Sequence, residues 1–221
     1  MTGQKTKKNI GVLYSGGLDS ATLIGYYLKK GFEVWPIFIR AGLRWEKIEH
    51  LFATKYLKAL TSPRLKKLTT LRISLENSYD KNWSKRGKTP GTHSSDQAVY
   101  LPARNLLLIS KASLFLFSHQ INRIAIASLK GNPFPDGKRS YFNLLQKILS
   151  RSFKRKIKIL TPFRNFGKLR VIRTNKDLPL HLTFSCLTPK GIHHCGKCNK
   201  CAERMRAFKK AGVPDRTKYA G

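Results

Sequence analysis

The turn at residues 15–20, which reads SGGLDS, constrains the fold of this chain more than any other feature. An apolar run at residues 10–14 precedes it and a helical pattern at residues 21–30 follows, so the chain passes there from a strand into a helix. Two glycines allow backbone N–H groups to converge on one point, where a Cβ would obstruct an approaching anion. The helix adds free N–H groups and the positive end of its dipole, and we expect Asp19 or Ser20 to be its N-cap.

Two interpretations of this turn are open. It is either a phosphate-binding site or an ordinary glycine-rich connection between a strand and a helix. A Walker loop is excluded, because no Gly-Lys-Ser or Gly-Lys-Thr follows and the lysine that grips phosphate in such loops is missing. If the turn binds phosphate, it belongs to a different class of anion site.

Apolar runs of strand length alternate with amphipathic stretches of helix length, which is the pattern of a βαβ protein. Because the strands are almost wholly apolar, we expect an α/β fold with a doubly wound, parallel five-stranded sheet covered on both faces. The expected strands are residues 10–14, 33–39, 69–75, 123–128 and 157–161. The expected helices are residues 21–30, 48–56 and 105–119, and Gly31 should end the first of them as a C′ glycine.

Two long connections interrupt this alternation, at residues 76–100 and 130–140. In open α/β sheets, loops near the carboxyl ends of strands tend to form the binding crevice. The first connection contains Trp83, Lys88, His93 and Asp96, and the second has two prolines and two glycines that predict an ordered turn rather than a helix. Both are also compatible with plain surface loops.

All four cysteines of the chain lie near its C-terminus, with the spacing C-x8-C-x2-C-x2-C. Thiolates this close in sequence can close around one tetrahedral ion, and such a closed shell is typical of structural Zn²⁺. We expect Gly196 to turn backbone amides toward the sulfurs, with Lys197 and Lys200 offsetting the negative charge. The neighbouring His193 and His194 should lie outside the ligand set. The expected ligands are Cys186, Cys195, Cys198 and Cys201.

Two alternatives to zinc remain for the cysteines. A cubane iron–sulfur cluster uses the same CxxCxxC core, and spacing alone does not exclude it. Two disulfides would require an exported protein, and no secretion signal supports that interpretation.

The formal net charge of +33 arises from 44 lysines and arginines against 11 acidic residues. Such an excess is typical of proteins that bind nucleic acid or another anionic surface. The basic residues are spread along the chain, with one denser stretch at residues 147–158. This spread is compatible either with non-specific affinity for tRNA and polyphosphate or with a basic bias of the source proteome.

At 221 residues the chain is long enough for one sizeable core. We expect a nucleotide-binding domain at residues 1–180 and a small C-terminal metal-binding module, residues 181–221, packed on it. The longest apolar region, residues 106–117, is interrupted by Lys111 and too short to span a bilayer, and the N-terminal apolar run is too short for a signal peptide. We therefore expect a cytoplasmic protein with no membrane partner.

Several segments occur together in this chain: SGGLDS, VYLPARN at residues 99–105, PFPD at 133–136, TPF at 161–163 followed by Lys168, and SCLTPKGIHHCGKCNKCAER at 185–204. Together they resemble the 7-cyano-7-deazaguanine synthases (QueC/ExsB-like) of the PP-loop ATP pyrophosphatase superfamily. The resemblance covers nearly the whole chain and is most specific at its C-terminus. SGGxDS alone is typical only of the superfamily, which includes tRNA-modifying and amide-forming enzymes.

The resemblance implies a HUP-like sheet, a zinc-binding helical module, and roles for individual residues. Asp19, Lys168 and Arg104 are the implied catalytic residues, and Arg104 with Asn105 opens a helix that faces the nucleotide. The implied ATP-binding residues, with Mg²⁺ accompanying the nucleotide, are Leu13, Tyr14, Ser15, Gly16, Gly17, Leu18, Asp19, Ser20, Ala21, Arg104, Asn105 and Lys168. The four cysteines match the zinc ligands of the family, whose members tend to form homodimers.

The implied reaction is an AMP-forming ligation of queuosine biosynthesis, in which 7-carboxy-7-deazaguanine, ammonia and ATP give the nitrile 7-cyano-7-deazaguanine. A carboxylate resists ammonia because oxide would have to leave, so it is first adenylated at the α-phosphate of ATP. Pyrophosphate then leaves into the turn, where helix N–H groups and Lys168 would stabilise its growing charge. A second activation, of the amide oxygen, allows AMP to leave and the nitrile to form.

Departures from the family pattern fall where the acceptor should bind. The stretch RAGLRWEKIEH replaces a Gly-Gln-Arg-His-like stretch, the loop GNPFPDGKR lacks a cysteine, and Leu182-Thr183-Phe184 stands where relatives often have Glu-Thr-Trp. The expected acceptor-binding residues are Trp45, Glu46, Asn132 and Asp136, although Trp45 is equally compatible with core packing. Two alternatives stay open: adenylation of a different carboxylate, on another base or a protein, and a tRNA-modifying or RNA-binding protein.

Overall fold

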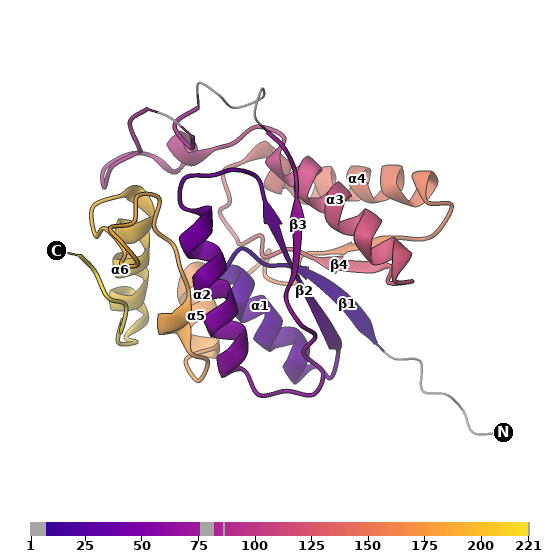
Figure 1. Cartoon of the computed structure of the whole chain (residues 1–221), viewed down its shortest axis with the longest axis horizontal. Helices are drawn as coiled ribbons and strands as arrows, with labels where there is room; N and C mark the ends of the chain where they lie inside the picture. Colours follow the sequence, from indigo (N-terminus) through magenta and orange to yellow (C-terminus); the bar gives the residue numbers. More distant parts are fainter. Residues whose placement is uncertain (1–7, 76–81, 86, 221) are drawn as a thin grey trace.

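The five strands pair in the order β3-β2-β1-β4-β5, and every pair is parallel. The computed structural model describes residues 8–75, 82–85 and 87–220 (Figure 1). The strands are β1 (Asn9–Leu13), β2 (Glu33–Arg40), β3 (Thr69–Arg72), β4 (Arg123–Ala125) and β5 (Lys158–Leu160). The helices are α1 (Leu18–Lys29), α2 (Glu46–Ala59), α3 (Arg104–Ser118), α4 (Arg139–Ser152), α5 (Lys168–Thr174) and α6 (Asn199–Ala211). Short 3₁₀ turns lie at Asp96–Val99, Pro135–Gly137 and Leu180–Leu182.

This order confirms the predicted doubly wound parallel sheet. The chain runs outward from β1 through β2 to β3, then returns to pair β4 with the other side of β1. The two connections beside β1 therefore leave it in opposite directions, which opens a crevice at the carboxyl ends of β1 and β4. Figure 1 shows α3 and α4 on one face of the sheet and α1, α2 and α5 on the other.

Several predicted boundaries are wrong by a few residues. The strands expected at residues 69–75 and 123–128 end at Arg72 and Ala125. Past Arg72 one more ladder bond forms, from Ile73 N–H to the Arg40 carbonyl, and β2 then ends; past Ala125 the N–H of Ser128 turns back to Ile126. The second proline- and glycine-rich connection is an ordered turn only as far as residue 138, because α4 begins at Arg139. Helices α4 and α5 were not predicted from the sequence.

Alternate residues of β1 face two separate cores. Ile10 and Val12 pack with α1, α2 and α5 in one cluster, whereas Leu13 packs with α3 and α4 in the other. Gly11 lies under α3, where a Cβ would come within 2.3 Å of the Leu116 side chain. The absence of a side chain at Gly11 thus lets α3 pack closely on the strand that leads into the turn.

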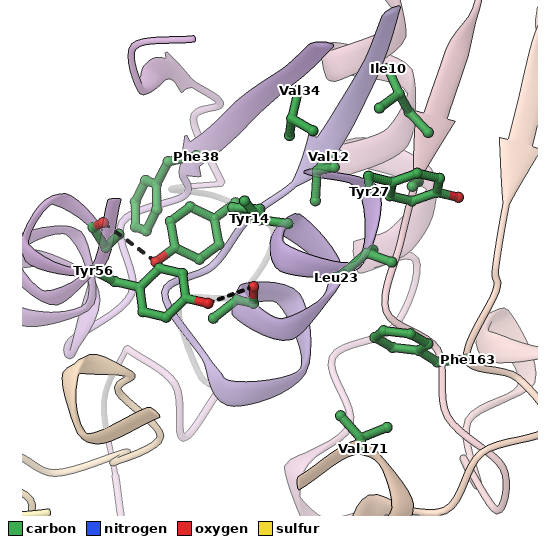
Figure 2. Packing of buried hydrophobic residues seen from close by; sticks show 14 residues of the cluster. Ile10, Val12, Tyr14, Leu23, Tyr27, Val34, Phe38, Tyr56, Phe163 and Val171 are labelled. Carbon is green, nitrogen blue, oxygen red and sulfur yellow. Dashed lines mark hydrogen bonds between the residues drawn. The ribbon is translucent and has the colours of Figure 1, made fainter. Parts of the chain in front are cut away.

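Two buried tyrosines fasten the turn after β1 between α1 and α2. The Tyr14 hydroxyl donates to the Ala53 carbonyl of α2 at 3.4 Å, and the Tyr56 hydroxyl of α2 donates to the Ala21 carbonyl of α1 at 2.9 Å (Figure 2). Burial raises the pKa of both tyrosines, so both hydroxyls stay protonated as donors. The turn is consequently held by two helices rather than by its own bonds alone.

The C-terminal segment packs on α5 through α6. Arg204 of α6 is buried, and its guanidinium donates to the Leu180 carbonyl at 2.9 Å and to the Thr183 hydroxyl at 2.8 Å. On its other side Arg204 lies 3.5 Å from Asp215, which fixes the end of the chain against α6. Among the helices that the structure describes, none has the length and apolar character needed to cross a bilayer.

Candidate active site

The turn after β1 is tighter than predicted. Its N-cap is Gly17, whose backbone is extended, and α1 already begins at Leu18, so the expectation of Asp19 or Ser20 as N-cap is wrong. The Ser20 side chain instead accepts from the Ser15 N–H at 3.2 Å and donates to the Gly17 carbonyl at 3.0 Å. Because Ser20 closes the turn on itself, the first N–H groups of α1 stay available to an external acceptor.

Gly16 adopts a backbone conformation that favours glycine, with φ of +80°. A Cβ at this position would lie 2.7 Å from the Glu49 carbonyl oxygen of α2. The Gly16 carbonyl in turn accepts from the Phe184 N–H at 2.8 Å, so the C-terminal segment also reaches the turn. Gly16 therefore shapes the site without lining it.

A cavity of about 380 Å³ opens at the carboxyl ends of β1, β2 and β4, directly above the turn. Of the residues predicted for nucleotide binding, those that line it are Leu13, Tyr14, Ser15, Gly17, Leu18, Asp19, Ser20, Arg104, Asn105 and Lys168. Gly16 and Ala21 do not line it, and Ala21 is fully buried on the inner side of α1. The topological switch point and the glycine turn thus share one cavity.

Lys168, the first residue of α5, lies at the mouth of this turn. Its Nζ is 2.6 Å from Asp19 Oδ2 and 3.1 Å from Glu203 Oε1. Burial lowers the pKa of Lys168, but the two carboxylates outweigh burial and hold the pKa above its ordinary value. The ammonium is therefore charged at neutral pH and positioned beside the anion site.

Glu49 and Arg104 form the charged part of the opposite wall. The pKa of Glu49 is raised to about 8, mainly by burial and also by Glu46, although Arg104 acts to lower it. The Nε of Arg104 is buried and has no hydrogen-bond partner in the part of the chain that the structure describes. Arg104 follows Ala103, which has a left-handed backbone at φ 58°, so the guanidinium is placed by a strained helix start.

The two tryptophans of this wall stack on each other. The rings of Trp45 and Trp83 are 5.4 Å apart with an interplanar angle of 11°, and both line the cavity. Trp45 is only 3% exposed, which agrees with the expected core packing. It also lies in the cavity wall, where the expected acceptor-binding residue would be. Of the first long connection, Lys88 and His93 are exposed and do not line the cavity, and residues 76–81 and 86 lie outside the described residues.

The other three residues predicted to bind the acceptor substrate form hydrogen bonds with the backbone of nearby segments. Glu46 lines the cavity, but its Oε2 accepts from the N–H groups of Ala41 and Gly42. Asp136 does not line the cavity; it accepts from the Asn105 N–H at 3.2 Å and so holds the start of α3. Asn132 also lies off the cavity wall, because its amide oxygen accepts from Phe134 N–H within the second loop.

The four cysteines converge as predicted. Their sulfurs all lie within 4.8 Å of one another and are buried, so the group could hold one metal ion. Backbone N–H groups donate to the sulfurs, among them Cys195 N–H to Cys186 Sγ at 3.2 Å and Lys197 N–H to Cys195 Sγ at 3.4 Å. The positive φ of Gly196, 74°, makes the second of these bonds possible, as expected.

His194 is buried beside this cluster but outside it. Its Nε2 accepts from the Ser185 N–H at 3.1 Å, and its ring packs on Phe184. Burial lowers the pKa of His194 to about 4, so the ring is neutral. The histidine thus links the cysteine cluster to the segment that contacts Gly16.

Comparison with known proteins decides the family. Residues 9–212 match the family model described as queuosine biosynthesis protein QueC. The chain belongs to the QueC family. It is 31% identical to the 7-cyano-7-deazaguanine synthase of Leptospira interrogans, over 93% of this chain and 88% of the relative. The 7-cyano-7-deazaguanine synthase of Thermoplasma volcanium is 30% identical, over 95% of this chain and 90% of the relative.

Solved structures share the fold of this QueC-family chain. A 4-thiouridine synthetase bound to RNA and ATP matches with a TM-score of 0.53 and 12% identity, over 93% of this chain and 50% of that one. The U34-tRNA thiolase NcsA of Methanococcus maripaludis, which carries a [4Fe-4S] cluster, matches with a TM-score of 0.50 and 12% identity, over 93% of this chain and 68% of that one. At such identity the likeness shows the fold alone.

Among the wall residues of the cavity that were not assigned to the site from sequence, four bear on its chemistry: Trp83, Glu49, Glu203 and Lys200. Glu49 and Glu203 stood out in the sequence only as two of the few acidic residues of a very basic chain. The scarcity of acidic residues in this chain was the one signal that could have drawn attention to them.

Proposed function

We propose that this chain is an ATP-dependent 7-cyano-7-deazaguanine synthase, which joins 7-carboxy-7-deazaguanine and ammonia and releases AMP and pyrophosphate. One observation carries the proposal for a chain of this family: the lysine-free glycine turn and Lys168 meet in one cavity at the switch point of the sheet. Curated relatives named 7-cyano-7-deazaguanine synthase match this chain over 88–92% of their own length.

In this proposal the turn receives the phosphates of MgATP. The N–H groups at the start of α1 and the ammonium of Lys168 face the β- and γ-phosphates, where charge grows as pyrophosphate leaves. Asp19 is the carboxylate closest to this point and would hold the Mg²⁺ that accompanies the nucleotide. Lys168 then exchanges its contact with Asp19 for the phosphates.

The opposite wall would bind the acceptor. The stacked Trp45 and Trp83 offer an aromatic surface for a deazapurine ring. The unpartnered Nε of Arg104 suits the acceptor carboxylate. Glu46, Asn132 and Asp136 then act indirectly, by holding the loops and the start of α3.

The metal we propose is zinc, with Cys186, Cys195, Cys198 and Cys201 as its ligands. A tetrahedral ion with Zn–S bonds of about 2.3 Å places sulfurs roughly 3.8 Å apart, and the observed separations stay within 4.8 Å. A cubane cluster binds each thiolate through a different iron and so holds the sulfurs farther apart. A closed set of four thiolates supplies structure rather than chemistry.

The zinc proposal has its own test. Cys198→Ser removes one ligand, and because metal binding is coupled to folding we expect loss of the metal and a fall in melting temperature of about 10 °C or more. Elemental analysis should find one zinc per wild-type chain. A brown protein that absorbs near 400 nm would contradict the assignment and favour an iron–sulfur cluster.

The same proposal has four further parts. They are ammonia as the nitrogen donor, a homodimer, non-specific affinity for nucleic acid, and a module boundary near residue 180. Support for the boundary comes from α6, which has its own buried cluster against α5. The charge of +33 supports only the nucleic-acid affinity.

The reaction is tested by mixing the enzyme with 7-carboxy-7-deazaguanine, ammonium and MgATP and following products by liquid chromatography and mass spectrometry. We expect the nitrile, AMP and pyrophosphate, and no AMP when the acceptor is omitted. AMP formation that depends on the acceptor but yields another product would favour a different ligation. No AMP with this acceptor would contradict the proposal.

A further inference from the structure

A chain of ion pairs joins the turn after β1 to α6. Lys168 bridges Asp19 and Glu203, with its Nζ at 2.6 and 3.1 Å from their oxygens. The second oxygen of Glu203 lies 2.7 Å from Lys200 Nζ, and Lys200 lies 3.7 Å from Asp96 at the outer end. Each carboxylate oxygen of Glu203 therefore has its own lysine.

Glu203 stands on a helix that the cysteine cluster places. Cys198 is the N-cap of α6 and Cys201 lies in its first turn, two residues before Glu203. Arg204, the next residue, is buried and bonded to the segment before the first cysteine. The carboxylate of Glu203 is thus fixed from both sides, whereas Lys168 ends a flexible four-carbon side chain.

Simple electrostatics argues against an acid at this place. Glu203 lines the same cavity as the turn and carries negative charge toward a site built for phosphate. Lys168 and Lys200 lie 3.1 and 2.7 Å from its two carboxylate oxygens, which is the pairing expected of an ionised carboxylate. Glu203 on its own would repel the phosphates of the nucleotide. Its contact with Lys168 can offset this repulsion, because it holds an ammonium group beside the phosphate site.

We propose that Glu203 is a positioning residue, which holds the Lys168 ammonium at the phosphate site and thereby makes MgATP binding depend on the C-terminal cysteine module. This inference rests on the proposed ATP site. With Glu203 in place, Lys168 is shared between two fixed carboxylates. Without it, the ammonium pairs with Asp19 alone and occupies the carboxylate that should hold Mg²⁺.

The test compares Glu203→Gln with Glu203→Asp in binding of the magnesium complex of α,β-methylene-ATP by calorimetry. If Glu203 acts by position, both variants bind about tenfold more weakly, because removing a residue that orients a ligand group typically costs 10- to 100-fold. In turnover, KM for MgATP should rise while KM for the acceptor stays unchanged. Asp96→Asn makes the same charge change at the outer end of the ion-pair chain, where Asp96 contacts Lys200 and not Lys168. This variant should bind the nucleotide with an affinity within about twofold of wild type.

A positioning role and a purely electrostatic role of Glu203 predict opposite changes in the nucleotide affinity of Glu203→Gln. If Glu203 contributes only its negative field, Glu203→Gln binds the nucleotide more tightly and Glu203→Asp binds like wild type, and the inference is overturned. Metal content and melting temperature of each variant are measured alongside. If Glu203→Gln loses its metal, Glu203→Asp, which keeps the charge between the lysines, decides between position and field. Wild-type protein that fails to bind the probe would overturn the proposed ATP site itself.

Discussion

The two walls of the cavity are built in different ways. The phosphate wall consists of residues 13–15 and 17–20, which belong to one short stretch of sequence shaped by Gly16, with Lys168 added from α5. The opposite wall takes Trp45, Trp83, Arg104 and Phe134 from separate segments. A wall made of consecutive residues is fixed by local backbone geometry, whereas a wall assembled from loops depends on packing between distant parts of the chain. The first should tolerate almost no change, and the second should tolerate more.

The largest expected effect is on the phosphate wall. Lys168→Met removes the only ammonium within 3 Å of Asp19 in the described structure, and we expect kcat to fall by about 10²- to 10³-fold, the usual loss when a group that stabilises transition-state charge is removed. Lys176→Met, at an exposed lysine just past α5, is the matched control and should keep full activity. A Lys168→Met enzyme that keeps more than a tenth of wild-type kcat would show that the phosphate wall tolerates substitution, which contradicts the expected difference between the two walls.

Gly16→Ala tests the backbone of the same wall. The new Cβ must take a φ of +80° and meets the Glu49 carbonyl at 2.7 Å, so we expect a loss of about 1–3 kcal/mol in the free energy of unfolding, with weaker nucleotide binding. Gly131→Ala is the control, because Gly131 has a φ of +82° but no atom within 4 Å of an added Cβ. Urea unfolding of both variants separates the clash from the backbone strain, and equal losses would contradict a role for the contact with α2.

A moderate effect is expected on the acceptor wall. Trp83→Leu removes the ring that stacks on Trp45, and we expect KM for the acceptor to rise about tenfold, since stacking of a base on an aromatic ring contributes roughly 1–3 kcal/mol. KM for MgATP should not change. Steady-state kinetics with each substrate varied in turn provides the measurement. A variant that changes both constants equally would remove the distinction between the two walls.

The last expected effect concerns the dependence of stability on pH. The carboxyl of Glu49 has a pKa of about 8 in the folded protein and an ordinary value near 4.5 when unfolded. Unfolding therefore releases a proton between these values, so this group stabilises the fold below about pH 4.5 and loses that contribution as the pH rises toward 8. We expect wild type to lose stability relative to Glu49→Gln between pH 5.5 and 8 in urea unfolding. A difference that does not vary with pH would mean that Glu49 is ionised throughout.

The success of prediction from sequence follows the same division. The sheet, the crevice and the cysteine cluster could be predicted because each depends on local patterns: apolar periodicity, a glycine turn and short cysteine spacing. Glu46 was expected to bind the acceptor, but it accepts from the N–H groups of Ala41 and Gly42, and no sequence pattern distinguishes an acid that binds a ligand from one that holds a loop. Glu203 was missed because its partner, Lys168, is distant in sequence and meets it only through the packing of α6 on α5.

The central claim is that this site adenylates a carboxylate, and oxygen transfer tests it most directly. 7-Carboxy-7-deazaguanine labelled with ¹⁸O in both carboxylate oxygens is incubated with the enzyme, ammonium and MgATP, and the nucleotide products are weighed by mass spectrometry. Each activation places one substrate oxygen on the α-phosphate, so the account predicts two AMP per nitrile, each carrying one ¹⁸O, and unlabelled pyrophosphate. Label in pyrophosphate or orthophosphate, or unlabelled AMP, would contradict it.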